Sequence, residues 1–379
     1  MAITRIAFAI AVLATISTVL AGEKPMKVYI MAGQSNMEGK AQVRTIARLN
    51  MTDDAKQMYQ DMKVKDGLPS AVEGTYCVYF NGGDKHRGRE RPVSVQKGPL
   101  KPGFSGETTE KTSFGPEYTF GLYMHKHLQS PILIIKTAWG GRDLVQQFRS
   151  PSGGEYEKDK DRFGNPTGYY YGQIIKHVKS VLADPGKYHP GYDKSAGYEI
   201  AGFVWFQGFN DMIQRYPKEE YGRLLACFIR DIRKDLNAPK MPFVIGVMGI
   251  GGIRKDDSFR KAQEAPAALP EFKGNVAAVR TGQFWDMELV RIQNKLNEAA
   301  KKELLAKNPK LGGRSLSKAI GKAAKSMAPK VLTPEEAKFL TVATSNAAYH
   351  YMGSAYIYGR IGKAFADAMI EMSKTTAAP

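Results

Sequence analysis

Five short apolar runs, separated by segments with the length of helices, constrain the fold of this chain more than any other feature. Continuous apolar runs of this kind are typical of parallel strands that are covered on both faces. Strands that alternate with helices predict a parallel sheet with right-handed crossovers. The predicted strands cover residues 27–30, 131–136, 200–206, 242–248 and 276–280, and the predicted helices cover residues 114–128, 169–182, 219–236 and 355–372.

Glycine and polar residues follow three of these strands. The first strand runs into residues 31–39 (MAGQSNMEG), where a strand that breaks at a glycine presents Ser35, a common way to expose a nucleophile. Gly140 follows the second strand and Asn210 follows the third. Ligand crevices in such sheets lie at the carboxyl ends of the strands, so we expect these three residues to converge there. Each turn taken alone is also compatible with a purely structural role.

His350 is the candidate base among the six histidines. It follows the last predicted strand and precedes the C-terminal helix, which is the chain order of a serine hydrolase on an open sheet. An unperturbed imidazole titrates near neutral pH and can remove the proton of a serine hydroxyl. A core or capping role is the alternative for this histidine.

In this order, residues 33–37 (GQSNM), the glycine pair at 140–141, residues 208–211 (GFND) and His350 resemble the conserved blocks of the SGNH-hydrolase superfamily. The GQSNM form is similar to the sialate O-acetylesterase branch, which includes the acetylxylan esterases of carbohydrate esterase family six. The similarity extends over about residues 27–372, with poor matches at about 41–111 and 290–342. It implies a three-layer flavodoxin-like α/β fold with a five-stranded parallel sheet and helices on both faces. It also implies no cofactor, no metal, and removal of acetyl groups from carbohydrate hydroxyls.

The resemblance assigns Ser35 as the nucleophile and His350 as the base. The oxyanion would accept hydrogen bonds from the Ser35 N–H, from a glycine N–H and from a side-chain amide. The implied oxyanion and substrate-binding residues are Gly140, Gly141, Asn210, Gln34 and Gln207.

The acid of the triad departs from the family pattern at two positions. The acid usually found three residues before the histidine is Ala347 here, and the glutamate that related acetylxylan esterases carry after Gln-Gly is Phe209. Asp211 is the first candidate, because it lies beside the oxyanion residue at the same strand end. Asp286 is the second candidate, and a Ser-His dyad is the third possibility.

The N-terminus predicts export. Arg5 precedes an apolar run at residues 6–20, and small residues near position 21 form a cleavage site, so residues 1–21 are predicted as a signal peptide. The protein would then be secreted or periplasmic, with a retained anchor as the alternative and no later membrane span. Export permits a disulfide between Cys77 and Cys227, but the helical, apolar surroundings of Cys227 favour a buried free thiol.

The formal net charge of +18 favours acidic partners. Together with export, it points to anionic polysaccharide or an envelope surface and not to nucleic acid. The segment at about residues 290–342 is rich in lysine and is predicted as a basic helical insertion, which is either an arm for an anionic polymer or a solvated surface. The segment at about 41–111 is predicted as a loop-rich excursion on the substrate side.

Three functions follow from these observations. The first is a secreted carbohydrate O-acetylesterase with an acetylated carbohydrate as its substrate. The second is a hydrolase of the same fold that acts on another ester, and the third is a catalytically dead homologue that binds carbohydrate or the cell envelope.

Overall fold

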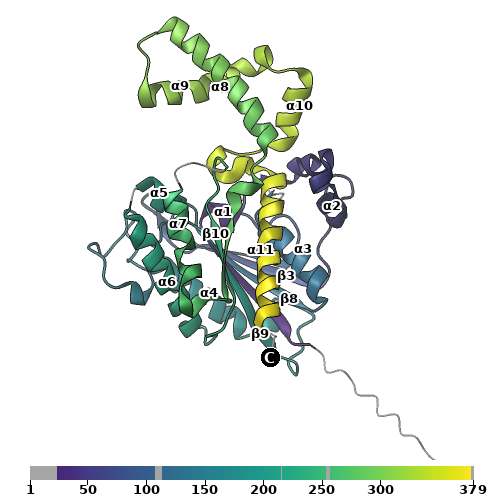
Figure 1. Cartoon of the computed structure of the whole chain (residues 1–379). Coiled ribbons are helices and arrows are strands. Elements are labelled where there is room, and N and C mark those ends of the chain that lie inside the picture. Colours follow the sequence, from purple (N-terminus) through teal and green to yellow (C-terminus); the bar gives the residue numbers. More distant parts are fainter. Residues whose placement is uncertain (1–23, 107–112, 215, 253–256, 377–379) are drawn as a thin grey trace, which may run out of the picture.

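The computed structural model describes residues 24–106, 113–214, 216–252 and 257–376, and the predicted signal peptide lies outside them. In these residues a mostly parallel seven-stranded sheet is flanked by helices (Figure 1). The strands of this sheet, in the spatial order β11-β10-β9-β1-β8-β3-β6, are β1 (Met26–Gly33), β3 (Thr75–Gly82), β6 (Val93–Pro99), β8 (Ile132–Ala138), β9 (Tyr198–Phe206), β10 (Phe243–Val247) and β11 (Val276–Arg280).

The five predicted strands are confirmed as parallel neighbours. The prediction of a five-stranded parallel sheet was wrong, because β3 pairs parallel with β8 and β6 pairs antiparallel with β3. Both added strands lie in the segment predicted as loop-rich. The edge strand β6 lacks an apolar signal, since its Val93 and Val95 are about half exposed and Lys97 interrupts the run.

The three central strands end at the same level. Gly33, the last residue of β1, lies opposite Ala138 of β8 and Phe206 of β9. The turns that follow these strands therefore meet at one edge of the sheet, which positions the predicted site residues close together.

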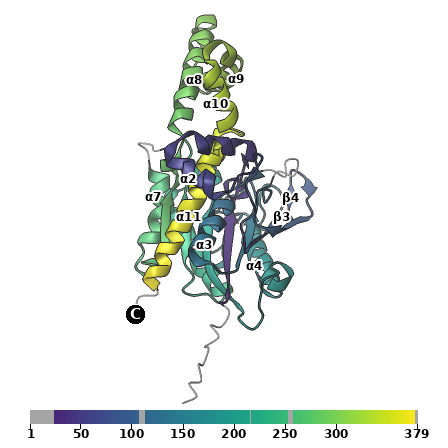
Figure 2. The ribbon, with the colours of Figure 1, turned by 90° about the vertical axis from the view of Figure 1, so that its right-hand side faces the viewer.

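Helices cover both faces of the sheet (Figure 2). Successive residues of β1 point to opposite faces, so that Val28 and Ile30 belong to one apolar core and Tyr29 and Met31 to the other. Each fully buried side chain of this kind stabilises the fold by about 1.5–3 kcal/mol. The covering helices are α3 (Glu117–Leu128) and α11 (Ala355–Thr376) on the face of Tyr29, and α4 (Tyr169–Leu182) and α6 (Lys218–Asp235) on the face of Val28.

The two cysteines are not bonded to each other. Cys77 on β3 and Cys227 on α6 are both buried free thiols, as the helical setting of Cys227 predicts. None of the described helices combines the length and the apolar content needed to cross a bilayer.

The shorter elements are α1 (Ser35–Glu38), η1 (Val43–Met51), α2 (Asp53–Asp61), α5 (Phe209–Gln214), α7 (Ser258–Glu264), η7 (Ala348–Gly353), and the small pairs β2 (Ala41–Gln42) with β7 (Ser113–Phe114) and β4 (Lys85–His86) with β5 (Arg89–Glu90).

The predicted basic insertion forms three helices that stand away from the sheet beyond its carboxyl edge (Figures 1 and 2). We call residues 287–343 the helical arm. Leu296 and Ala300 of one helix pack against Ala324 of the next, which gives the arm a small apolar core of its own. Its helices are α8 (Met287–Lys307), α9 (Gly313–Val331) and α10 (Pro334–Ala343).

Candidate active site

Ser35 is the first residue of α1, directly after β1. A Cβ on Gly33 would lie 2.2 Å from the carbonyl oxygen of Phe206, so only glycine allows β1 to turn this close to β9. Ser35 is 8% exposed, and its hydroxyl makes no hydrogen bond with the residues that the structure describes. Its N–H is at a helix N-terminus, where no intrahelical acceptor exists. Ser35 therefore keeps both a free hydroxyl and an N–H suited to an oxyanion.

Gln34 ties the turn after β1 to the turn after β9. Its Oε1 accepts hydrogen bonds from Gln207 Nε2 (3.2 Å) and from Gly208 N (3.1 Å), and its Nε2 donates to Asn210 Oδ1 (3.3 Å). Gln207 also donates to the carbonyl oxygen of Arg142 (2.9 Å). Gln34 and Gln207 are 1% and 0% exposed. The two side chains support these turns from within, and their predicted contact with the substrate stays a prediction.

Asn210 presents a side-chain amide at the same edge. Its Nδ2 donates to the carbonyl oxygen of Gly141 (2.8 Å). Because an amide nitrogen carries two hydrogens, this bond fixes the amide and leaves the second hydrogen for a ligand. The geometry is compatible with the predicted role of Asn210 as an oxyanion donor.

The two predicted glycines differ. The N–H of Gly140 donates to Glu38 Oε1 at 2.7 Å, so Gly140 is removed from the oxyanion donors. Gly141 has a φ of +74°, a conformation that favours glycine, and its N–H has no acceptor among the described residues. Gly141 is thus the glycine that remains available.

Glu38 is a site residue that the sequence analysis missed. Its side chain is buried, accepts the Gly140 N–H, and lies 3.3 Å from Lys40 Nζ through Oε2. A Cβ on Gly106 would meet Oε2 at 2.7 Å, so Gly106 leaves room for this carboxylate. The available signal was an acidic residue three positions after the serine, within the same motif.

The turn that carries His350 lies beside α1. Asn36 Nδ2 donates to the carbonyl oxygen of Tyr349 (3.2 Å), and Asn36 Oδ1 accepts from the Tyr358 hydroxyl (3.0 Å). Tyr351 anchors the same turn, since its hydroxyl accepts from Gly249 N at 2.8 Å. The structure therefore places the turn that carries His350 beside α1, the helix that begins with Ser35.

Asn346 contacts the His350 ring. Its Oδ1 lies 2.9 Å from His350 Nδ1 and also accepts the Ala347 N–H at 2.8 Å. Because the backbone N–H requires an oxygen, this atom is the amide oxygen, and Nδ1 must then be the protonated ring nitrogen. Nε2 is left as the basic nitrogen. The family pattern places the acid three residues before the histidine, whereas this contact comes from the residue four before it.

The structure gives Asp211 a different role from the predicted one. Asp211 is completely buried, and its carboxylate accepts hydrogen bonds from Leu144 N (2.9 and 3.1 Å), Val145 N (3.1 Å) and Gln207 Nε2 (2.6 Å). These bonds hold the segment after Gly141. The prediction of Asp211 as the acid that orients His350 is corrected accordingly: Asp211 fixes the segment that follows Gly141.

Asp286, the second candidate acid, is also engaged elsewhere. It accepts the Glu288 N–H at 3.1 Å as the N-cap of α8, and it pairs with Arg48 at 2.8 and 3.2 Å. Capping bonds and a buried ion pair explain an aspartate at this position without catalysis.

Asp211→Asn should alter the pH dependence of stability more than it alters catalysis. Burial and the nearby charge of Asp143 raise the pKa of Asp211 to about 8, whereas its hydrogen bonds oppose this shift. A raised folded-state pKa contributes stability that is present below the unfolded value of 3.8 and is lost as the pH rises through the folded value. Urea unfolding of the native protein between about pH 5 and pH 9 should therefore show a decline in stability that is smaller in Asp211→Asn.

The catalytic rate of Asp211→Asn tests the same assignment from the other side. We expect kcat of Asp211→Asn to stay within about tenfold of the native value, since asparagine keeps an oxygen that accepts backbone N–H groups. Asp286→Asn is a matched control, because it neutralises another buried carboxylate. A loss of about 10³-fold or more in Asp211→Asn alone would return the role of orienting the histidine to Asp211.

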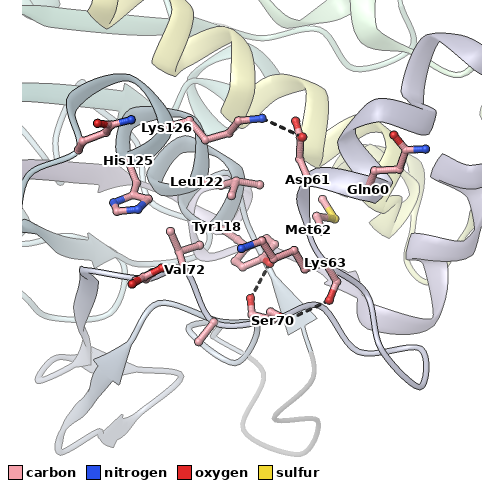
Figure 3. A pocket seen from close by; sticks show the side chains of 13 residues that line it. Gln60, Asp61, Met62, Lys63, Ser70, Val72, Tyr118, Leu122, His125 and Lys126 are labelled. Carbon is pink, nitrogen blue, oxygen red and sulfur yellow. Dashed lines mark hydrogen bonds and ion pairs between the residues drawn. The ribbon is translucent and has the colours of Figure 1, made fainter.

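A surface cavity of about 590 Å³ lies on another part of the molecule (Figure 3). It is lined by the end of α2, the loop before β3, and α3. In it the Tyr118 hydroxyl donates to the carbonyl oxygen of Ser70, and Lys126 pairs with Asp61, both at 2.8 Å. None of the predicted site residues lines it. In the described part of the chain, no group of three or more His, Cys, Asp or Glu side chains is arranged for a metal ion.

Sequence comparison relates this chain to known carbohydrate esterases, as the motifs suggest. The family model described as carbohydrate esterase, sialic acid-specific acetylesterase matches residues 25–289. A probable carbohydrate esterase of Arabidopsis thaliana is 22% identical over 241 residues, which cover 63% of this chain and 75% of that protein. Its X-ray structure aligns with a TM-score of 0.40 at 21% identity, over 68% of this chain and 86% of that chain. A carbohydrate acetylesterase from Xanthomonas citri aligns with a TM-score of 0.41 at 16% identity, over 66% of this chain and 49% of that chain.

The family match includes the turns after β1, β8 and β9 and ends before most of the helical arm and η7. It covers well over half of the 379 residues. The chain therefore belongs to the carbohydrate esterase family of sialic acid-specific acetylesterases.

Proposed function

We propose that this protein is a secreted carbohydrate O-acetylesterase that works through an acetyl-enzyme formed on Ser35. The observation that carries the proposal is the convergence at one sheet edge of the Ser35 hydroxyl, the Asn210 amide and the turn that carries His350. Family membership supports the ester and carbohydrate classes.

The reaction begins with attack of Ser35 Oγ on the acetyl carbonyl carbon while His350 Nε2 takes the hydroxyl proton. The resulting oxyanion accepts hydrogen bonds from the N–H groups of Ser35 and Gly141 and from Asn210 Nδ2. The tetrahedral intermediate collapses, the C–O bond to the sugar breaks, and His350 gives its proton to the departing sugar oxygen. Water then attacks the acetyl-enzyme with His350 as base, which releases acetate and restores the serine.

Glu38 and Asn346 act on this reaction through other groups. Glu38 holds the N–H of Gly140, which fixes the position of the next residue, Gly141. Asn346 accepts the Nδ1–H of His350, so that in the neutral ring the basic lone pair is on Nε2. An amide orients the ring but carries no charge, so it stabilises the imidazolium less than an aspartate would.

Asn346→Ala should lower kcat by about tenfold, because the lost hydrogen bond contributes about 1–1.5 kcal/mol and 1.4 kcal/mol corresponds to a factor of ten. Steady-state kinetics with para-nitrophenyl acetate measure this effect. Asn346→Asp is the informative partner variant, because an anion beside the ring should raise the pKa of His350 and move the acidic limb of the pH–rate profile upward. Unchanged kinetics and pH profiles in both variants would show that another group orients His350.

The proposed function is tested by acetate release from the purified chain. The substrates are para-nitrophenyl acetate, O-acetylated xylan and an O-acetylated sialic acid, with para-nitrophenyl butyrate and octanoate as longer acyl esters. We expect acetate release from at least one carbohydrate and a preference for acetyl over the longer acyl groups. A preference for the longer esters would favour the alternative of another ester hydrolase, and no hydrolysis at all would favour a carbohydrate-binding homologue without activity.

The secreted location rests on the pattern of residues 1–21. Expression of the full chain in a bacterial host with an export pathway tests it. We expect a processed product outside the cytoplasm whose N-terminus lies near Gly22. A product that keeps residues 1–21 in the membrane fraction would indicate a retained anchor instead.

A further inference from the structure

The outer part of the helical arm has an unusual charge. Residues 301–330 contain nine basic residues and a single acidic one, Glu303, which gives this short segment a large share of the net charge of the chain. The basic residues are Lys301, Lys302, Lys307, Lys310, Arg314, Lys318, Lys322, Lys325 and Lys330.

The base and the outer part of the arm differ in how their charges are compensated. At the base, Glu336 of α10 pairs with Arg291 at 2.9 Å and with Lys295 at 2.6 Å on α8, so these cations have an acidic partner on another helix of the arm. Farther out, Lys307 pairs with Glu303 at 2.5 Å within its own helix, so this ion pair does not join two helices of the arm.

Three lysines of α9 form a stripe on its solvent side. Lys318, Lys322 and Lys325 are spaced by four and three residues, which places them on one face of a helix. All three are exposed, and none has an ion-pair partner among the described residues. The opposite face of α9 packs on α8 through Ala324 and its neighbours Ile320 and Met327. Because the apolar face already folds the arm, the lysine stripe is not needed for packing.

The arm is connected directly to the active site. It begins after the N-cap Asp286, and the chain leaves α10 at Ala343 to enter the turn that carries Asn346 and His350. Figures 1 and 2 show it rising from the carboxyl edge of the sheet, where Ser35 also lies. A polymer held on the arm would therefore be kept on the side of the sheet where its strands end and α1 begins.

We propose that the lysine stripe of α9 (Lys318, Lys322 and Lys325) docks an acidic, carboxylate-bearing polysaccharide and so delivers its O-acetylated residues to Ser35; the delivery step rests on the proposed esterase function. The chemistry of the arm favours this partner over a membrane or a nucleic acid. Residues 301–330 contain no aromatic residue to stack on bases, and no large apolar side chain there is prominently exposed for insertion into lipid. Lysines on flexible stems suit a chain of carboxylates at variable spacing.

The test uses the full chain with all three lysines of the stripe replaced by glutamine. Two acetylated polymers are compared, O-acetylated polygalacturonate as the acidic one and O-acetylated glucomannan as the neutral one, with para-nitrophenyl acetate as the small substrate. At low salt, about 20 mM, we expect KM for the acidic polymer to rise about tenfold or more in the variant, with kcat unchanged. The neutral polymer and the small ester should be hydrolysed as by the native protein. At about 200 mM salt the difference between the two proteins should shrink, because added salt screens exposed charges.

A matched control removes the same charge elsewhere. Lys176 and Lys179 on α4 and Lys194 before β9 are exposed, and their triple replacement by glutamine lowers the net charge equally. We expect this control to behave as the native protein does. Equal effects of both triple variants would show a response to net charge alone and would overturn the docking assignment.

A direct binding measurement tests docking on the lysine stripe separately from the proposed esterase activity. Binding of deacetylated polygalacturonate to the native protein, followed by fluorescence anisotropy, needs no catalysis, so it supports docking even if no ester is hydrolysed. We expect binding that weakens with salt and is reduced about tenfold or more in the stripe variant. Absence of binding by the native protein, or tighter binding to anionic phosphatidylglycerol vesicles or to DNA at the same salt concentration, would overturn the assignment of an acidic polysaccharide.

Discussion

Replacement of Ser35 by alanine should reduce kcat for para-nitrophenyl acetate by about 10³-fold or more, because it removes the atom that bonds to the acetyl carbon. The folded structure should be unaffected. The hydroxyl makes no hydrogen bond with the described residues, so its loss should change the free energy of unfolding by less than about 0.5 kcal/mol. Steady-state kinetics and urea unfolding of the same preparation measure the two effects.

Two further measurements make this prediction specific. Native protein mixed with the aryl ester and quenched early should contain an acetyl group on the peptide of Ser35, detected by mass spectrometry, and Ser35→Ala should not. Ser373→Ala, at an exposed position on α11, is the matched control and should retain native kinetics. Activity of Ser35→Ala within about tenfold of the native value would remove Ser35 from the reaction.

The arrangement of the site at the sheet edge was predictable from the sequence because strand ends are marked in the chain. The apolar runs before Ser35 and Asn210 end where polar and glycine residues begin, and β1 and β9 end in register at Gly33 and Phe206. The motif residues then meet because the sheet is parallel. No knowledge of side-chain direction was needed for this step.

The direction of a side chain was not predictable in the same way. Asp211 follows Asn210 directly, yet on the short helix α5 the two side chains make different contacts. Asn210 binds the carbonyl oxygen of Gly141, and Asp211 binds the N–H groups of Leu144 and Val145. A separation of one residue on a helix turns a side chain by about 100°. Proximity in sequence to an oxyanion donor therefore says little about contact with His350.

Contacts that depend on an unusual backbone conformation were also not predictable from the sequence. Tyr351 and Met352 adopt left-handed conformations with φ of 48° and 61°, and each costs of order 1–3 kcal/mol for a residue other than glycine. The turn they form lets Asn346 N donate to the carbonyl oxygen of Met352 at 3.0 Å, and it holds Asn346 beside the His350 ring. These two left-handed residues are not glycines, so the sequence carries no signal for this turn.

Asn210→Ala should lower kcat by about 10²–10³-fold with little change in KM, because an oxyanion donor acts mainly on the transition state. The effect should exceed that of Asn346→Ala, since the Asn210 amide would touch the reacting oxygen whereas Asn346 acts through the His350 ring. Kinetics with para-nitrophenyl acetate and with an acetylated carbohydrate should show the same fractional loss, because the oxyanion is common to both substrates.

The competing explanation is that Asn210→Ala loosens the turn by removing its bonds to Gly141 and Gln34. Gln34→Ala distinguishes the two, because Gln34 is buried and supports the same turn through its bonds to Gly208 and Asn210. If support alone mattered, Gln34→Ala would lose as much kcat as Asn210→Ala and more stability, since it breaks several buried hydrogen bonds. A larger loss of kcat in Asn210→Ala, with a smaller loss of stability, would place the amide on the oxyanion. A change in KM with unchanged kcat would make Asn210 a residue that binds the ground state of the substrate.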